Sequence, residues 1–192
     1  MHLGNDDAAT PHRLFFALWP DAALRKQIAT TVPGLERDNA AGGRRMNPDR
    51  YHLTLQFLGD FKPLRQDVLD AAIAAAASVH LPPFDLVLDL AGSFPKAGVR
   101  WLGASTVPET LQQLWNELGQ ALTSAQVPVR SMPTFNPHLT VLRDVRKPLP
   151  PTPVQPLSWA VREFVLVDSV SGAHPAYRVL GHWPLRDDRD GT

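Results

Sequence analysis

Short hydrophobic runs, some continuous and some alternating with polar residues, predict the strands of this chain. The run at 84–92 alternates, with Asp85 and Asp89 between apolar neighbours, as expected of a strand that buries one face. The run at 13–20 is continuous and ends at Pro20, as expected of a buried strand. The full set of predicted strands covers residues 13–20, 51–60, 84–92, 98–105, 137–144, 158–170 and 176–185.

Apolar residues spaced three or four positions apart predict three helices between these strands. The helices fall within residues 21–32, 63–80 and 106–122. The Gly- and Arg-rich stretch 33–49 is predicted to be a loop, and the proline-rich stretch 147–157 an extended crossing segment. Because strands and helices are mixed and neighbouring strands look antiparallel, the predicted fold class is α+β.

The composition narrows the classes of function. Lys plus Arg equals Asp plus Glu, with 19 of each, so a broad basic surface for duplex nucleic acid is not expected. The absence of Cys excludes disulfides, thiolate catalysis and Cys-based metal sites. No apolar run approaches the roughly 18 residues that span a membrane, and the N-terminus is too polar for a secretory signal, which predicts a cytoplasmic protein. We expect flexible ends at 1–11 and 186–192 around a single bilobal domain at 12–185.

Two predicted strands carry the same His-x-Thr pattern. His52 and Thr54 lie in YHLTLQFLGD, and His138 and Thr140 lie in PHLTVLRD, near the other end of the chain. Successive side chains of a strand alternate between its two faces, so each His shares a face with its Thr while the aliphatic neighbours point to the core. One such strand in each half of the chain favours two lobes related by approximate twofold symmetry.

If the two strands face each other, their polar side chains suit an in-line displacement at phosphorus. One imidazole can take a proton from the attacking water while the other gives a proton to the departing oxygen, and an unperturbed pKa of about 6.5 suits both roles. The Thr hydroxyls can donate hydrogen bonds to phosphoryl oxygens, so no metal is needed. A single His-x-Thr on an apolar strand is usually structural, and residue chemistry alone leaves both interpretations of the pair open.

Five segments carry a family resemblance: RLFFALWP at 13–20, HLTLQFLGD at 52–60, NPHLTVLRD at 136–144, and FVLVDSV and YRVLGHWPL near the end. Together they resemble the opening, catalytic and closing strands of the RNA 2′,3′-cyclic phosphodiesterases, or 2′-5′ RNA ligase-like proteins, of the 2H phosphoesterase superfamily. This resemblance runs from Arg13 to Leu185. It implies a bilobal α+β fold of two pseudo-twofold antiparallel sheets, with helices on the outside and a central cleft.

The resemblance also implies an activity: hydrolysis of an RNA or nucleotide 2′,3′-cyclic phosphate to a 2′-phosphate, with no metal or other cofactor. On this basis His52 would give a proton to the leaving 3′-oxygen and His138 would activate water. Thr54 and Thr140 would hold the phosphoryl oxygens. Reversible 2′-5′ joining of RNA ends is a related activity of the same site. The alternative function is a non-catalytic module that binds nucleotides or RNA ends in this cleft, and a monomer is the default expectation.

Three further residues are candidates for substrate contact. Phe57 and Arg143 each follow their His by five positions, which strict alternation places on the core face, so a β-bulge or a strand end must turn them toward the cleft. Phe57 would then stack on a base, and Arg143 would bind phosphate, a role that the family resemblance favours. In the alternative, Phe57 is a core residue and Arg143 pairs with Asp144 or faces solvent. Phe16 is the third candidate, for the base pocket, with core packing as its alternative.

Overall fold

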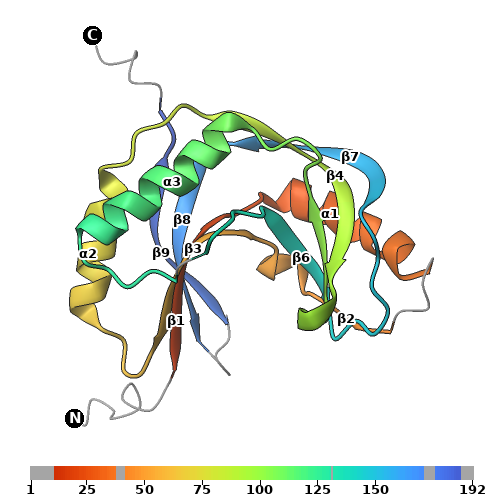
Figure 1. Cartoon of the computed structure of the whole chain (residues 1–192), viewed down its shortest axis with the longest axis horizontal. Coiled ribbons are helices and arrows are strands. Elements are labelled where there is room, and N and C mark those ends of the chain that lie inside the picture. Colours follow the sequence, from red (N-terminus) through yellow and green to blue (C-terminus); the bar gives the residue numbers. More distant parts are fainter. Residues whose placement is uncertain (1–10, 38–41, 131, 171–175, 187–192) are drawn as a thin grey trace.

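A long antiparallel sheet organises the molecule, with three helices packed against it (Figure 1). The computed structural model describes residues 11–37, 42–130, 132–170 and 176–186. Its helices are α1 (Ala22–Arg37), α2 (Gln66–Ala77) and α3 (Glu109–Ser124). Its strands are β1 (His12–Leu18), β2 (Arg44–Arg45), β3 (Leu53–Phe61), β4 (Phe84–Phe94), β5 (Val99–Gly103), β6 (His138–Arg143), β7 (Thr152–Val161), β8 (Glu163–Val170) and β9 (Tyr177–Pro184). The predicted α+β class is confirmed.

The strand order of the sheet has an internal symmetry. It runs β7-β4-β5-β6-β3-β1-β8-β9, with β2 paired to β6 beside this path. Four strands therefore lie on each side of the β6–β3 junction, and the two strands that carry His-x-Thr are the central pair. The junction itself is short, because Leu53 and Leu139 form its one cross-strand pair, and the two halves of the sheet diverge from it (Figure 1).

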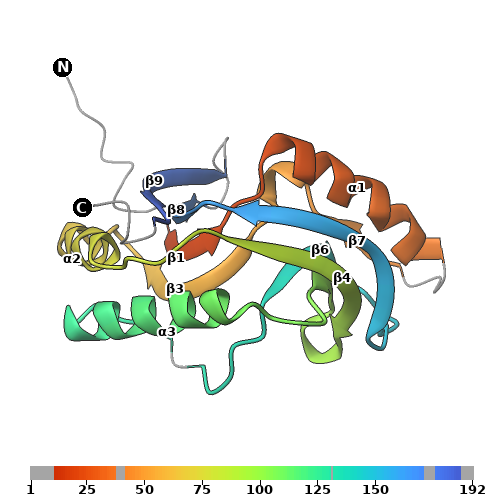
Figure 2. The same cartoon turned by 90° about the horizontal axis from the view of Figure 1, so that it is seen from above.

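The helices divide between the two halves of the sheet. Figure 2 shows α2 and α3 side by side over the half that contains β1, β3, β8 and β9, while α1 lies along the other half beside β7. The predicted helical periodicity explains this packing. Leu24, Ile28 and Val32 line the buried side of α1, and the leucines of α3 at 111, 114, 118 and 122 are fully buried.

Three connecting segments differ from the prediction. The predicted loop 33–49 begins with the last turn of α1, which continues to Arg37, and later forms β2. The proline-rich 147–157 segment enters β7, which lies at the edge of the sheet, where Pro153 and Pro156 need donate no hydrogen bond to a further strand. The predicted strand 158–170 is two strands, because the chain turns at Arg162.

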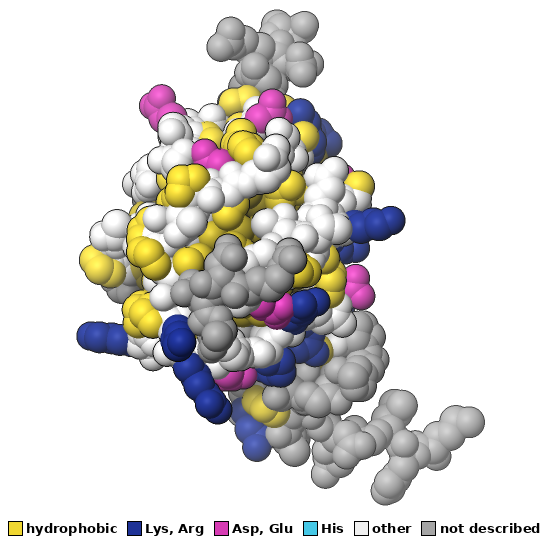
Figure 3. All heavy atoms as spheres, turned by 90° about the vertical axis from the view of Figure 1, so that its right-hand side faces the viewer, with side chains coloured by type: hydrophobic (Ala, Val, Ile, Leu, Met, Phe, Trp, Pro, Cys, Tyr) yellow, Lys and Arg dark blue, Asp and Glu magenta, His cyan; other side chains and the backbone are white. Residues whose placement is uncertain are grey.

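One hydrophobic core draws on both halves of the sheet, with residues from Leu14 to Leu185. The predicted flexible ends lie outside the described residues, apart from residues 11 and 186, and the single-domain boundaries at 12–185 stay a prediction. On the face shown in Figure 3, hydrophobic side chains lie across the middle, and basic and acidic side chains are interspersed around them. None of the described helices is long and apolar enough to cross a membrane.

Candidate active site

The four His-x-Thr side chains gather around the Leu53–Leu139 pair. Both leucines are fully buried and point into the core, so the residues next to them point to the opposite face. Extending the antiparallel register by one residue in each direction places Thr140 across from His52 and His138 across from Thr54. The two His are then diagonal neighbours, which in an antiparallel pair lie roughly 7–8 Å apart. Side chains at diagonal positions on one face of a sheet can contact the same small ligand.

The charges of the two His and Arg143 act on one another. Burial is the largest cause that lowers the pKa of both imidazoles; the charge of Arg143 lowers both further, and a proton on His138 lowers the pKa of His52. Arg143 is exposed, at the end of β6. The alternative partner that the sequence left open, Asp144, instead forms an ion pair with Arg44 at 3.5 Å. The structure therefore places a cation beside the two imidazoles, where an anionic substrate would need one.

Each imidazole is held by the backbone carbonyl two residues before it. Nδ1 of His52 lies 2.7 Å from the carbonyl oxygen of Arg50, and Nδ1 of His138 lies 2.8 Å from that of Asn136. A carbonyl oxygen only accepts, so each Nδ1 carries a proton and donates it. In the neutral ring Nε2 is then left with a free lone pair. Both His are thereby oriented to accept a proton, or to donate one after gaining it, through the same nitrogen.

Aromatic rings enclose His52 on several sides. Trp19 stacks on the imidazole with 5.7 Å between ring centroids and 13° between planes, Phe15 lies at 4.9 Å, and Tyr177 meets it edge-on at 5.6 Å. The resulting burial lowers the pKa of His52 to about 4. The sequence analysis missed these rings. Phe15 and Trp19 belong to one apolar run, but only the fold shows that they lie with Tyr177 around His52.

His138 has a less crowded environment. Phe94 meets its ring edge-on with 4.8 Å between centroids, and burial again is the largest cause that lowers the pKa of His138. Both imidazoles are therefore largely neutral at pH 7 in the unliganded site. A bound phosphate anion would raise the pKa of each, so a proton on one of them is stabilised by the substrate itself.

The two Thr hydroxyls are available to a ligand. Thr54 and Thr140 are half-buried, and among the described residues neither hydroxyl has a hydrogen-bond partner. Each shares the face of its His, as the strand alternation predicts. Two hydroxyl donors at diagonal positions on one face can bind the non-bridging oxygens of one phosphoryl group.

A β-bulge in each of the two strands brings a further residue to the same face. In β3 the register shifts at Leu55, so that Thr54 pairs with Ala17 while Phe57 pairs with Phe15. In β6 the register shifts at Val141. Each bulge lies three residues after its His, and each reverses the alternation beyond it. The bulges that the sequence analysis required for Phe57 and Arg143 are thus present.

Phe57 and Phe16 have different environments. Phe57 is half-buried on the His52 side of β3, against a small cluster that includes Phe15, and the guanidinium of Arg13 lies 5.9 Å above its ring. Its proposed base contact stays a prediction. Phe16 is fully buried between Phe164 and Trp183, so its predicted place in a base pocket is wrong. Because the run at 13–20 is continuously apolar, its pattern does not show which residues share the face of His52. Of its two Phe residues, Phe15 does.

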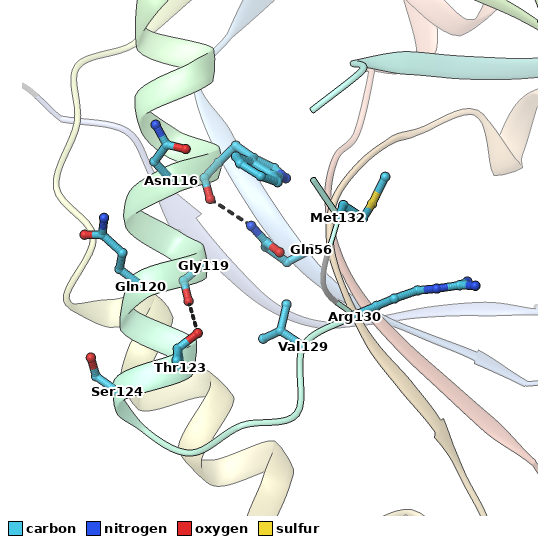
Figure 4. A pocket seen from close by; sticks show the side chains of 10 residues that line it. Gln56, Asn116, Gly119, Gln120, Thr123, Ser124, Val129, Arg130 and Met132 are labelled. Carbon is cyan, nitrogen blue, oxygen red and sulfur yellow. Dashed lines mark hydrogen bonds between the residues drawn. The ribbon is translucent and has the colours of Figure 1, made fainter. Parts of the chain in front are cut away.

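Two cavities differ in their relation to this site. One, of about 230 Å³, reaches His138 and is lined by residues of β4, β5 and the segment before β6. A larger one, of about 610 Å³, lies between α3 and the side chains of Val129, Arg130 and Met132 (Figure 4). Its wall includes Gln56, which is buried on the core face of β3 and donates a hydrogen bond to the carbonyl of Trp115. Since none of the predicted site residues lines the larger cavity, it is separate from the reaction site.

Comparison with known proteins shows the family to which this chain belongs. A family model described as LigT like Phosphoesterase matches residues 18–101. The RNA 2′,3′-cyclic phosphodiesterase of Escherichia coli (strain K12) is 36% identical over 182 residues, which cover 91% of this chain and 97% of that protein. This chain belongs to the RNA 2′,3′-cyclic phosphodiesterase family. A member of the family from Archaeoglobus fulgidus is 29% identical over 138 residues, covering 70% of this chain and 74% of that protein.

Solved structures of RNA 2′,3′-cyclic phosphodiesterase relatives have the same fold. Apo E. coli LigT matches with a TM-score of 0.77 and 34% identity, over 93% of this chain and all of that one. Its complex with 3′-AMP matches with a TM-score of 0.75 and 32% identity, over 92% of this chain and 99% of that one. The family and the antiparallel α+β fold predicted from the sequence are confirmed, although the two predicted sheets are one continuous sheet joined at the β6–β3 junction.

Proposed function

We propose that this chain hydrolyses the 2′,3′-cyclic phosphodiester at the end of an RNA or on a nucleotide, leaving a 2′-phosphomonoester. Family membership supports the reaction, and the arrangement of His52, His138, Thr54 and Thr140 supports its mechanism. The observation that carries the proposal is the convergence of two imidazole–hydroxyl pairs on one face, around the single Leu53–Leu139 junction. A relative that binds 3′-AMP supports a nucleotide as the ligand.

The reaction is an in-line displacement at phosphorus. His138 takes the proton from water as water attacks, the P–O3′ bond breaks, and His52 gives a proton to the departing 3′-oxygen. The assignment of donor and acceptor follows the family. His138 suits the role of base because its lowered pKa keeps it neutral. His52 gains its proton only when the substrate anion has raised its pKa, so His52 is not yet a proton donor in the unliganded site.

Thr54, Thr140 and Arg143 stabilise the negative charge that builds on phosphorus. The hydroxyls donate to the non-bridging oxygens, and the guanidinium adds a positive charge beside both imidazoles. In the described part of the chain, no group of three or more His, Asp or Glu side chains is placed to hold a metal ion. The mechanism asks for none, and resistance to EDTA is one of its expectations.

Replacement of the two His tests the proposal. His52→Ala and His138→Ala are each expected to lower the hydrolysis of adenosine 2′,3′-cyclic phosphate by at least about 10²–10⁴-fold while the circular dichroism spectrum is unchanged. His80→Ala, at an exposed His outside the site, is the matched control. Retained activity in both site variants would remove the assignment. Tight binding of the nucleotide without turnover by the unaltered chain would favour the binding-module alternative.

Several finer properties stay predictions. Hydrolysis and reversible 2′-5′ joining use the same groups in opposite directions, so an assay of RNA ends with a 5′-hydroxyl is needed to separate them. A cytoplasmic location and a monomeric state rest on the sequence analysis. Size-exclusion chromatography with light scattering measures the second of these directly.

A further inference from the structure

Trp115, on α3, contacts the chain near both His-x-Thr motifs. Its ring stacks on that of Phe135, with 5.2 Å between the ring centroids and 13° between the planes. Its backbone carbonyl accepts a hydrogen bond of 2.8 Å from Nε2 of Gln56, in β3. A single residue of the helix therefore contacts both β3 and the segment that leads into β6.

The ring stack lies next to the group that orients His138. Phe135 directly precedes Asn136, whose backbone carbonyl oxygen lies 2.8 Å from Nδ1 of His138. Because a planar peptide bond joins Phe135 to Asn136, a displacement of Phe135 also moves this carbonyl. The direction of the imidazole therefore depends on where Trp115 holds Phe135.

The 610 Å³ cavity lies against Trp115 and Gln56 (Figure 4). Its volume is within the range of about 300–1,000 Å³ that is typical of small-molecule sites. Gln56 in its wall is buried, and Gly119 makes room for this side chain, because a Cβ atom at residue 119 would lie 2.8 Å from Nε2 of Gln56. The cavity lies on the core side of β3, so a molecule in it would leave the face that carries His52 and Thr54 free.

The wall of the larger cavity is polar but almost uncharged. Carboxamide and hydroxyl side chains line it: Gln56, Asn116, Gln120, Thr123 and Ser124. Among the described residues that line it, Arg130 alone is charged, and its side chain extends away from α3 (Figure 4). A charged ligand would lose hydration that this wall replaces poorly, whereas the hydroxyl and amide groups of a ligand find both donors and acceptors there. The wall therefore favours an uncharged ligand with several hydrogen-bonding groups.

We propose that the larger cavity is an effector site, in which an uncharged molecule of sugar size with several hydroxyl or amide groups binds and promotes catalysis through the Trp115–Phe135 stack. The effect on catalysis rests on the proposed function, whereas the binding does not. A ligand that contacts Trp115 in its stacked position stabilises this arrangement over others. It is the arrangement in which the carbonyl of Asn136 orients His138.

Two tryptophans report on the two sites separately. Trp19 stacks on His52, and Trp115 lines the larger cavity. The indole N–H of Trp115 is buried and has no acceptor among the described residues, so an acceptor supplied by a ligand would shift its NMR signal.

Indole N–H spectra of the full chain, assigned with Trp19→Phe and Trp115→Phe, therefore test binding. Ribose, which has hydroxyls alone, and N-acetylglucosamine, which adds an amide, are expected to shift the Trp115 signal and not the Trp19 signal. The charged ribose 5-phosphate is expected to do the reverse, because its phosphate suits the site between the two His.

Rates of hydrolysis test the effect of binding. The uncharged probe that shifts Trp115 is expected to raise kcat/KM for adenosine 2′,3′-cyclic phosphate roughly 5-fold or more. Phe135→Leu removes the ring stack, so it should keep the shift of the Trp115 signal and lose the effect on the rate. Asn116→Trp fills the cavity from an exposed position of α3 and should abolish both. Gln113→Trp, at an exposed position of α3 outside the cavity, is the matched control.

The outcomes are distinct. If neither ribose nor N-acetylglucosamine shifts the Trp115 signal, the cavity is not the proposed site. If a probe shifts Trp115 and leaves kcat/KM unchanged, or if its effect on the rate persists in Asn116→Trp, the effector role is wrong. If the unaltered chain hydrolyses no cyclic nucleotide, the proposed function itself fails, and a shift of the His138 imidazole signals by the bound probe still tests the coupling.

Discussion

Leu53 and Leu139 face each other as the cross-strand pair that joins β3 to β6, and both are fully buried. Each leucine lies between the His and the Thr of its own motif. The same contact therefore closes the core on one face of the sheet and sets the distance between the catalytic candidates on the other. Because the junction has this single pair, the geometry of the site depends on the packing of two side chains.

Leu139→Ala tests this dependence. Removing a fully buried leucine side chain is expected to lower the free energy of unfolding by about 2–5 kcal/mol, through lost burial and the cavity left behind. Urea unfolding at pH 7 measures the loss of stability. The rate of hydrolysis is also expected to fall, even at temperatures where the variant is still folded. Ile73→Ala, at a 37% exposed position of α2, is the control and should be nearly neutral. A Leu139→Ala protein as stable as the parent would contradict the structural role of the junction.

The pH dependence of hydrolysis is expected to differ between kcat/KM and kcat. The reactive form needs one neutral and one protonated imidazole, so kcat/KM peaks between the two pKa values of the free site. Both are lowered from 6.5, that of His52 to about 4, which places the kcat/KM maximum below pH 6.5. Bound phosphate raises both pKa values, so the kcat maximum lies at higher pH. Steady-state rates between pH 4 and pH 9 measure both curves, and coincident maxima would contradict the mechanism.

Burial of His52 also makes the stability of the fold depend on pH. The pKa of this imidazole is about 4 in the folded chain and about 6.5 in the unfolded chain, so the unfolded chain takes up the proton first as the pH falls. The free energy of unfolding is therefore highest above pH 6.5 and declines between pH 6.5 and pH 4, by up to about 3 kcal/mol for this group.

Chemical denaturation at several pH values checks this expectation. His52→Asn cannot titrate, so the part of the decline between pH 6.5 and pH 4 that His52 causes should disappear. His138 shifts in the same direction, so some decline should remain. His80→Asn, at an exposed position outside the site, is the control variant. An unchanged pH dependence in His52→Asn would show that the ring is not held neutral by burial.

Arg143→Gln is expected to have two effects. Loss of a charged hydrogen-bond donor to phosphate should lower kcat/KM roughly 10- to 100-fold. Since the Arg143 charge lowers the pKa of both His, its removal should raise both pKa values and move the kcat/KM maximum to higher pH. Because Arg143 is exposed, the second effect should shrink at high salt. NMR titration of the imidazole protons measures the pKa values of both His, and the exposed Arg146→Gln is the control. Unchanged pKa values in Arg143→Gln would place Arg143 outside the site.

The sequence by itself determined the pairing of each His with its Thr, because alternation along a strand is a local property of the backbone. It also determined the three helices, whose apolar stripes match the buried faces of α1, α2 and α3. The repeated motif then sufficed to indicate the family, since the residues proposed to do the chemistry lie within two short segments.

Tertiary structure alone decided which faces meet. The register of Leu53 on Leu139, the bulges at Leu55 and Val141, and the position of Tyr177 beside His52 all join segments that are far apart in the chain. A continuous apolar run does not show which of its residues face outward. The sequence analysis therefore proposed Phe16, whereas Phe15 is the residue beside His52. The cavity beside His138 likewise joins separate segments, with Trp101 and Gly103 from β5 and Phe135 from the segment before β6. Such features arise from packing between distant residues, and hydrophobic patterning along the chain does not encode them.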